Sequence, residues 1–162
     1  MRTAIAAGLL LLVATPASAQ WVHQKQESAF GGAAKHVAVT VRGTYGFGLR
    51  CQSDELTAIL LAPEAITFDD AQRFKQLSPI MLLRIDNGEV LQLDALVESS
   101  EGQLRVGAAI DVATAHDIAK ARRRVAAALS LQGKQYHEHQ FGVSGSSRAV
   151  GQMLKGCGLP QP

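Results

Sequence analysis

The stretch HVAVTVRGTYGFGLRC, residues 36–51, contains two alternating runs separated by a short turn. The first run places its valines on one face of a strand, because successive side chains point to opposite faces: Val37, Val39 and Val41. The second run does the same with Tyr45, Phe47, Leu49 and Cys51. Gly43 and Thr44 lie between the runs, and glycine at the first central position is typical of a type II′ turn. The stretch therefore predicts an antiparallel hairpin that points Cys51 inward.

Five further stretches predict strands of the same sheet. They are residues 56–62, 80–85, 90–97, 104–110 and 135–143. The first is apolar on both faces, which suits a central strand covered on both sides, and Pro63 is expected to end it. The pair Asn87-Gly88 is a strong hairpin signal between the second and third stretches, and the fourth extends them into a three-stranded meander.

Three other stretches predict helices. Thr67 and Asp70 have the spacing of a capping box, which begins a helix ended by Ser78-Pro79. A longer helix is expected over residues 114–131, with three consecutive arginines on its solvent face. Residues 144–147 are expected to cap a last helix. Its apolar face would consist of Ala149, Val150, Met153, Leu154 and Cys157.

The composition favours a globular protein and excludes several other classes. The chain has 162 residues, of which 47% are hydrophobic and 19% charged, so it is long enough to bury a substantial core. Its 16 basic and 14 acidic residues give a formal net charge of +2, which supplies no basic surface for nucleic acid. The chain also lacks the Gly-X-Y or heptad repeats of a fibrous protein.

The first 19 residues have the pattern of a secretory signal peptide. Arg2 precedes an uncharged apolar run, and Ala17-Ser18-Ala19 places small residues at the two positions that a signal peptidase reads. The run is too short to span a bilayer as a helix, and no cysteine follows the site to accept a lipid. We expect cleavage after Ala19, a single domain over residues 20–162, and a periplasmic or secreted protein without a transmembrane segment.

The two cysteines of the chain, Cys51 and Cys157, both lie in the part expected to be exported. In an oxidising compartment a single pair usually forms a disulfide, and their wide separation excludes a C-x-x-C redox motif. Both side chains are expected to point toward the core, one from a strand and the other from the last helix. The sequence therefore predicts an α+β domain with a mainly antiparallel sheet of about seven to eight strands, three helices and one disulfide.

His137 and His139 are the most suggestive candidates for a metal site. Residues two apart in a strand share a face, so the two imidazoles could bind one Zn²⁺ or Cu²⁺. His36 or His23 could supply a third ligand, although nothing in the sequence brings them together. The alternative is a pair of polar histidines that lead into a core position at Phe141.

No catalytic set is recognisable, and no cofactor is expected. Gly142-Val143-Ser144-Gly145 has a nucleophile-like context, but the residue two positions after Ser144 is serine, where a nucleophile elbow needs glycine. These serines are better explained as helix caps, with an anion at the helix start as the alternative. Asp69-Asp70 fits the first turn of a helix, where carboxylates complement the helix dipole, better than an acid–base pair.

Two further features have a structural and a functional interpretation. Arg122, Arg123 and Arg124 could contact an acidic partner or lipid headgroups, but a solvated helix face explains them as well. Trp21, together with Val22, is expected to tie the start of the exported chain into the sheet. An exposed aromatic anchor for a partner is the alternative.

Several of these residues together carry a resemblance to known proteins. They are Trp21, the strand end Leu49-Arg50-Cys51, and a terminal pattern that runs from Phe141 through Ser144-Gly145-Ser146-Ser147 and Ala149 to Cys157. In this layout the chain resembles small exported proteobacterial proteins, namely the invasion-associated locus B family and periplasmic accessory proteins of type VI secretion. The resemblance implies a periplasmic, non-enzymatic accessory or host-interaction role and carries over no catalytic residue.

The leading hypothesis is a non-enzymatic binding or accessory protein of the cell envelope that acts through protein–protein contacts. A second hypothesis is a metal-binding periplasmic protein that uses His137 and His139. A third is an inhibitor or immunity-type protein that blocks an envelope hydrolase. An exposed loop that reaches into a target's cleft would favour the third hypothesis, and residues 24–34 and 63–79 are the candidate regions.

Overall fold

The computed structural model describes residues 20–162, so the expected signal peptide and its cleavage site after Ala19 lie outside the described residues. These residues form one nine-stranded sheet, antiparallel at every strand pair, in the order β1-β2-β3-β4-β7-β6-β5-β8-β9. The strands are β1 (Val22–Gln26), β2 (Lys35–Arg42), β3 (Tyr45–Gln52), β4 (Glu55–Ala65), β5 (Ile80–Ile85), β6 (Val90–Ser100), β7 (Gln103–Ala109), β8 (Val125–Leu131) and β9 (Lys134–Phe141). The fold is α+β as expected, but the sheet has nine strands and not seven to eight.

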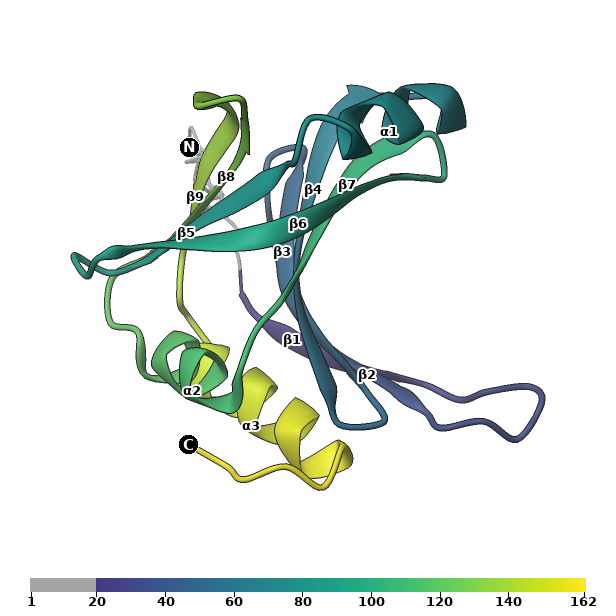
Figure 1. The fold of residues 1–162 in the computed structure, drawn as a ribbon. Coiled ribbons are helices and arrows are strands. Elements are labelled where there is room, and N and C mark those ends of the chain that lie inside the picture. Colours follow the sequence, from purple (N-terminus) through teal and green to yellow (C-terminus); the bar gives the residue numbers. More distant parts are fainter. Residues whose placement is uncertain (1–19) are drawn as a thin grey trace, which may run out of the picture.

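The sheet curves strongly around the core, and helices lie at both of its ends (Figure 1). Helix α1 (Phe68–Lys75) lies at the top of Figure 1, whereas α2 (Val112–Lys120) and α3 (Ser146–Gly156) lie together at the bottom. The curvature brings β2 and β9, which lie near the two opposite edges of the sheet, close together. Nη1 of Arg42 on β2 donates to the backbone oxygen of Gln140 on β9 at 2.8 Å, and Nε1 of Trp21 donates to the oxygen of Gly142 at 2.8 Å. The large side chains of the core fill the space inside, among them Phe47, Phe141, Leu49, Leu60, Met81 and Leu129.

The predicted hairpin of β2 and β3 is confirmed, and the valines of β2 share one face as expected, which is the outer face. Phe47 and Leu49 of β3 point into the core, and in β2 it is His36, Ala38 and Thr40 that are buried, while the valines face outward. The register explains this result, because Thr40 pairs with Phe47 and Ala38 with Leu49. The large β3 side chains fill the interior, so smaller residues fit beside them on β2.

Two expectations for β4 were wrong. The strand continues through Pro63 to Ala65, and its pairing with β7 is irregular between Ala62 and Ala65. A proline is tolerated at such an irregularity because no regular ladder hydrogen bond is lost there. The strand lies in the middle of the sheet, but only one face is covered, since Ile59 and Leu61 on the other face are partly exposed.

The helix predicted over residues 114–131 was the largest error. Helix α2 begins at Val112 after an Asp111 cap and ends at Lys120, and the chain then forms strand β8. The carboxylate of Asp86 accepts hydrogen bonds from the backbone N–H groups of Arg122, Arg123 and Arg124 at 2.9, 2.7 and 3.0 Å. These bonds hold the turn between α2 and β8, so the arginines lie in a loop and not on a helix face.

The predictions for the first and last helices were mostly confirmed. Thr67 and Asp70 form the predicted capping box of α1. Helix α3 buries the predicted apolar face, although Cys157 at its end is only partly buried. The cap of α3 differs from the expectation: the N-cap is Gly145 with φ 80°, and no serine side chain caps the helix.

The predicted disulfide between Cys51 on β3 and Cys157 after α3 is present. Their Cα atoms are 6.4 Å apart across a sequence separation of 106 residues. The bond fastens the last helix to the sheet, and a disulfide fits a periplasmic or extracellular protein. Within residues 20–162 the helices are too short or too polar to cross a membrane.

Candidate functional site

A β-bulge in β9 positions the most concentrated group of polar side chains inside the sheet. Ala127 pairs with His139 and Leu129 with Tyr136, so Ala128 faces two residues of β9. The extra residue, His137, has a φ of 54°, a conformation that is uncommon for a residue with a side chain. His137 points inward, on the same face as His139 and Phe141, and its neighbour Glu138 is exposed.

Both ring nitrogens of His137 have a partner. Nε2 lies 2.6 Å from Oε2 of Glu64 on β4, and Nδ1 lies 3.3 Å from the hydroxyl of Tyr45 on β3. The second predicted histidine lies beside the same tyrosine, since the rings of His139 and Tyr45 are stacked with centroids 4.3 Å apart. Burial, and secondarily the charge of Arg42, lowers the pKa of His139, so this imidazole is neutral over a wider pH range.

The structure thus brings His137 and His139 together but does not complete a metal site. In residues 20–162 no cluster of three or more His, Cys, Asp or Glu side chains could hold an ion. The proposed third ligands, His23 and His36, bond to each other at 3.2 Å, and His36 lies at the far end of β2 from the Tyr45 turn. The sequence could not show that His137 is already engaged by Glu64, because 73 residues separate them and they lie on different strands.

A cavity of about 280 Å³ lies next to His137. Its floor is apolar and its rim is polar, and the lining consists of Glu64, Phe74, Leu77, Leu104, Leu129, Leu131, Gln132, Lys134, Tyr136 and His137. Mouths of curved sheets are common positions for small-molecule sites. The opposed charges of Glu64 and Lys134 give this rim no single preference for an anion or a cation.

The other candidates from the sequence have structural roles. The backbone oxygen of Ser144 accepts a hydrogen bond from Trp21 at 2.9 Å, so this segment anchors the N-terminal end of the described chain. The carboxylate of Asp70 accepts hydrogen bonds from the hydroxyl and the backbone N–H of Thr67, the N-cap of α1, and these bonds lower the pKa of Asp70. Trp21 is buried against Phe47, with ring centroids 6.0 Å apart, which confirms the structural interpretation of this tryptophan.

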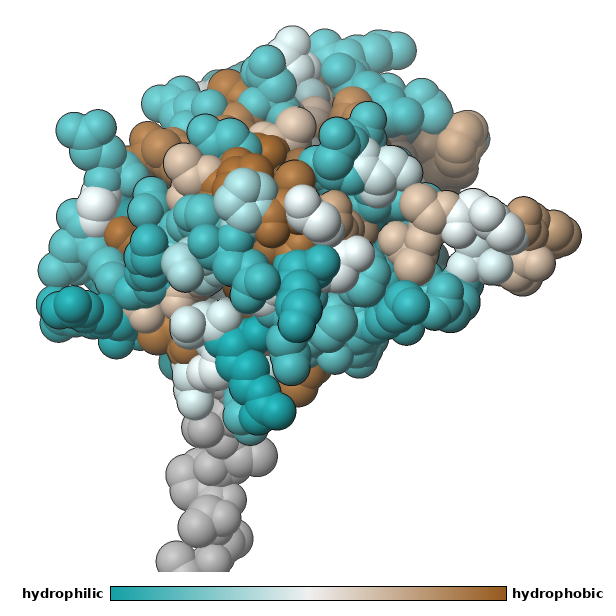
Figure 2. All heavy atoms as spheres, turned by 90° about the horizontal axis from the view of Figure 1, so that it is seen from below, coloured by the Kyte–Doolittle hydropathy of each residue, from teal (hydrophilic) through white to brown (hydrophobic). Residues whose placement is uncertain are grey.

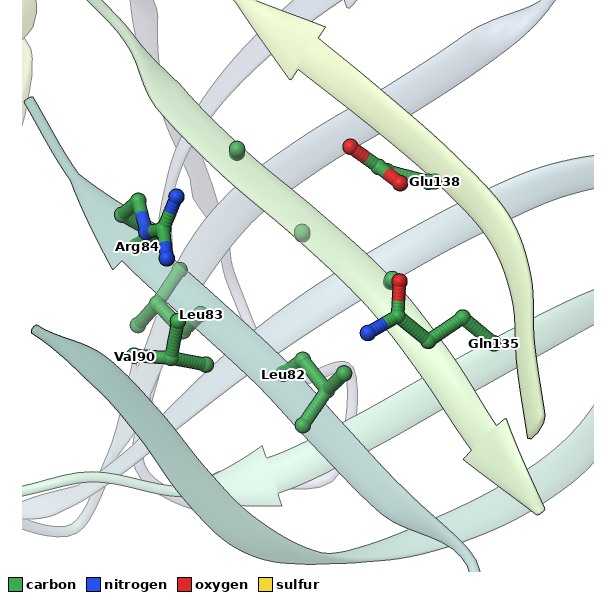
Figure 3. A pocket seen from close by; sticks show the side chains of 9 residues that line it. Leu82, Leu83, Arg84, Val90, Gln135 and Glu138 are labelled. Carbon is green, nitrogen blue, oxygen red and sulfur yellow. The ribbon is translucent and has the colours of Figure 1, made fainter. Parts of the chain in front are cut away.

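A hollow of about 120 Å³ lies on the outer face of the second half of the sheet (Figure 3). We refer to it as the alanine hollow; it is lined by Leu82, Leu83, Arg84, Val90, Ala126, Ala127, Ala128, Gln135 and Glu138. In Figure 3 Arg84 on β5 and Glu138 on β9 lie on opposite sides of β8. This hollow could not be predicted from the sequence, because the stretch that forms its floor was expected to be helical.

The first half of the sheet has an apolar outer face. Strand pairing aligns six outward residues in one row: Val22, Val39, Gly48, Ile59, Gly107 and Leu96. A Cβ atom at Gly48 would lie 2.6 Å from the backbone oxygen of Ala38, so only glycine fits there. A second outer hollow of about 180 Å³ lies beside Gly48, Val37 and Leu61.

The loop between β1 and β2, residues 27–34, projects from the body of the protein (Figures 1 and 2). Phe30 in this loop is 100% exposed. Oγ of Ser28 accepts hydrogen bonds from the N–H groups of Phe30 and Gly32 at 3.3 and 3.0 Å, which orders the backbone around the ring. Figure 2 shows hydrophobic atoms at the end of this projection, at the right of the view.

The fold defines a sheet-dominated α+β protein with one disulfide and candidate binding surfaces on both sides of its sheet. Among solved structures it is similar to the crystal structure of invasion associated protein B from Bartonella henselae, with a TM-score of 0.53 and 12% sequence identity over 88% of this chain and 96% of the other. The resemblance to the invasion-associated locus B family is therefore confirmed at the level of the fold. No protein-family model matches the chain, and no curated protein matches it in sequence.

Proposed function

We propose that this chain is an exported, non-enzymatic binding protein of the cell envelope that acts through protein–protein contacts, and that the 27–34 loop is its contact element. The supporting observation is the fully exposed Phe30 in this projecting loop. Phenylalanine, like the other aromatic residues, is enriched in protein–protein interfaces relative to the rest of the surface. The fold likeness to an invasion associated protein supports an exported accessory role.

The chemistry of the loop suits insertion into an apolar cleft. The residues beside the ring are small, namely Ala29, Gly31, Gly32, Ala33 and Ala34. They leave the ring accessible from several sides, and the Ser28 hydrogen bonds reduce the entropy that the loop loses on binding. Full burial of a phenylalanine side chain contributes about 1.5–3 kcal/mol, which corresponds to roughly a 10- to 100-fold change in affinity.

A crosslinking experiment tests the proposal. A photoreactive phenylalanine analogue is placed at position 30 in the full chain and, as the matched control, at Phe68, which is 69% exposed on α1. The protein captured from position 30 is then purified, and its affinity is measured for the wild type, Phe30→Ala and Phe68→Ala. We expect binding at least about tenfold weaker for Phe30→Ala only. Equal affinity of the three proteins would contradict the proposal.

An inhibitor of an envelope hydrolase is the second candidate, because the same slender loop could occupy a substrate cleft. In that case the captured partner is a hydrolase, and saturating wild-type protein abolishes its activity while Phe30→Ala does not. Metal binding through His137 and His139 is the weaker proposal, since both nitrogens of His137 already have partners. Equilibrium dialysis with Zn²⁺ and Cu²⁺ tests it, and equal uptake by a His137→Ala/His139→Ala variant would exclude it.

A further inference from the structure

The alanine hollow has an apolar floor because two small residues of β8, Ala126 and Ala128, point outward there, while Ala127 between them points into the core. Ala126 pairs with Arg84 on β5, and the next outward position, Ala128, pairs with Leu82. On the other side Ala128 faces the bulge of β9, where regular pairing is interrupted. Larger side chains surround these two outward alanines on both sides, so the outer face is recessed at this point.

Charged groups of opposite sign lie across this floor. The side chains of Arg84 and Glu138 both line the hollow and are exposed, and within the described residues neither takes part in an ion pair. They belong to β5 and β9, the two neighbours of β8. Neighbouring strands are about 4.8 Å apart, so the two backbones are separated by about 10 Å. A small molecule can therefore lie between the two charges.

The polar groups around the hollow divide into a positive and a negative end. At the level of Ala126, Arg84 lies on one side and Gln140 on the other, and Nη1 of Arg124 donates to Oε1 of Gln140 at 3.3 Å. This places two guanidinium groups near one end of the floor. Glu138 and the amide of Gln135 lie nearer the bulge and supply acceptors there.

We propose that the alanine hollow binds a free α-amino acid with a small apolar side chain. The guanidinium of Arg84 would receive the carboxylate, for which its planar pair of N–H groups is suited. Glu138 would receive the ammonium group, and the side chain would lie on the alanines next to Leu82 and Val90. The volume of about 120 Å³ is below the 300–1,000 Å³ that is typical of pockets for larger ligands, so the site favours the smallest amino acids.

Titration of the ¹⁵N-labelled full chain with L-alanine, followed by NMR, tests the site. We expect saturable shifts of the backbone amides of residues 126–128. Arg84→Gln and Glu138→Gln should each weaken binding at least about tenfold, while the matched controls Arg148→Gln and Glu55→Gln, both of exposed residues away from the hollow, should not. N-acetyl-L-alanine lacks the ammonium group and L-alaninamide lacks the carboxylate, so neither should reach the affinity of L-alanine.

Several results would overturn the inference. They are the absence of saturable shifts with L-alanine, unchanged affinity in Arg84→Gln, and equal binding of N-acetyl-L-alanine, which would indicate an anion site only. Ala128→Leu fills the floor of the hollow and should abolish binding. If Ala128→Leu does not fold, Arg84→Gln still tests the site. The site is independent of the 27–34 loop, so Phe30→Ala should bind L-alanine like the wild type.

Discussion

The Nε2 atom of His23 on β1 lies 3.2 Å from Nδ1 of His36 on β2, and the planes of the two rings differ by only 5°. One hydrogen bond joins the rings, so one nitrogen must carry a proton and the other must not. His36 is only 6% exposed, and its ring lies against Gly156, the residue before Cys157. The pair therefore lies where β1, β2 and the disulfide-bonded end of α3 meet.

The histidine pair predicts a loss of stability in mild acid. Burial, and secondarily the neighbouring His36, lowers the pKa of His23 below its usual value of 6.5. The unfolded chain therefore takes up this proton at a higher pH than the folded protein does. The contribution of neutral His23 to the free energy of unfolding is therefore complete above pH 6.5 and decreases as the pH falls below this value. We expect the urea midpoint of the wild type to decrease as the pH is lowered from 7.5 to about 5.

The variant His23→Gln should show a smaller decrease over the same range, and His116→Gln, at a partly exposed histidine of α2, serves as the control. Some decrease should remain, because the pKa of His139 is also lowered by burial. An identical pH dependence of His23→Gln and the wild type would show that the pair does not contribute.

Substitution by alanine should have opposite effects on the free energy of unfolding at two glycines of α3. A Cβ atom at Gly156 would overlap the ring of His36, whereas nothing lies within 4 Å of a Cβ atom at Gly151. Gly156→Ala should lower the free energy of unfolding by about 1–3 kcal/mol, as overpacking does. Gly151→Ala should raise it by about 0.5–1 kcal/mol, because alanine is the better helix former. Urea denaturation measures both, and equal effects would contradict the packing of His36 against α3.

Removal of the disulfide should destabilise the protein strongly. The bond closes a loop of 106 residues, for which the loss of unfolded-state entropy gives about 4–5 kcal/mol. The double variant Cys51→Ala/Cys157→Ala should therefore unfold at a much lower urea concentration than the oxidised wild type. Reduced wild type is the control and should behave like the variant. A midpoint that is unchanged in both would mean that α3 is held by its buried apolar face alone.

The sequence predicted the elements whose evidence is local. The turn at Gly43, the capping box at Thr67 and the hairpin at Asn87-Gly88 depend on neighbouring residues and were found as expected. The directions of both cysteine side chains were also predicted correctly, because the period of a strand or a helix determines the direction of a side chain.

The errors arose where distant residues decide the local structure. The stretch that forms β8 is rich in alanine and leucine, which favour helices, but it pairs with β5 and β9 on either side. The candidate sites were missed for the same reason. Neither the contact of His137 with Glu64 nor the pairing that places Arg84 across β8 from Glu138 can be inferred from one strand.

The stretch that was wrongly predicted to continue the helix is held in its actual conformation by Asp86, whose carboxylate bonds to the loop that follows α2. Its carboxylate accepts hydrogen bonds from three consecutive backbone N–H groups of residues 122–124, and the bond from Arg122 is the main cause of its lowered pKa. Asp86→Ala leaves all three groups without this acceptor, while Asp86→Asn keeps one oxygen. The midpoint of thermal unfolding should therefore decrease from the wild type to Asp86→Asn and further to Asp86→Ala.

Because Asp86 is charged, its contribution to stability depends on pH, which distinguishes its hydrogen-bonding role from packing alone. Because the pKa is lower in the folded protein, the carboxylate stabilises the fold above its ordinary pKa of 3.8, and this contribution is lost as the pH falls through the lowered value. The difference between the wild type and Asp86→Ala should consequently shrink below pH 3.8. Asp94→Ala, a change at an exposed aspartate of β6, is the control and should have little effect. Hydrogen exchange at residues 122–125 should increase in Asp86→Ala only, since the same bonds protect the start of β8.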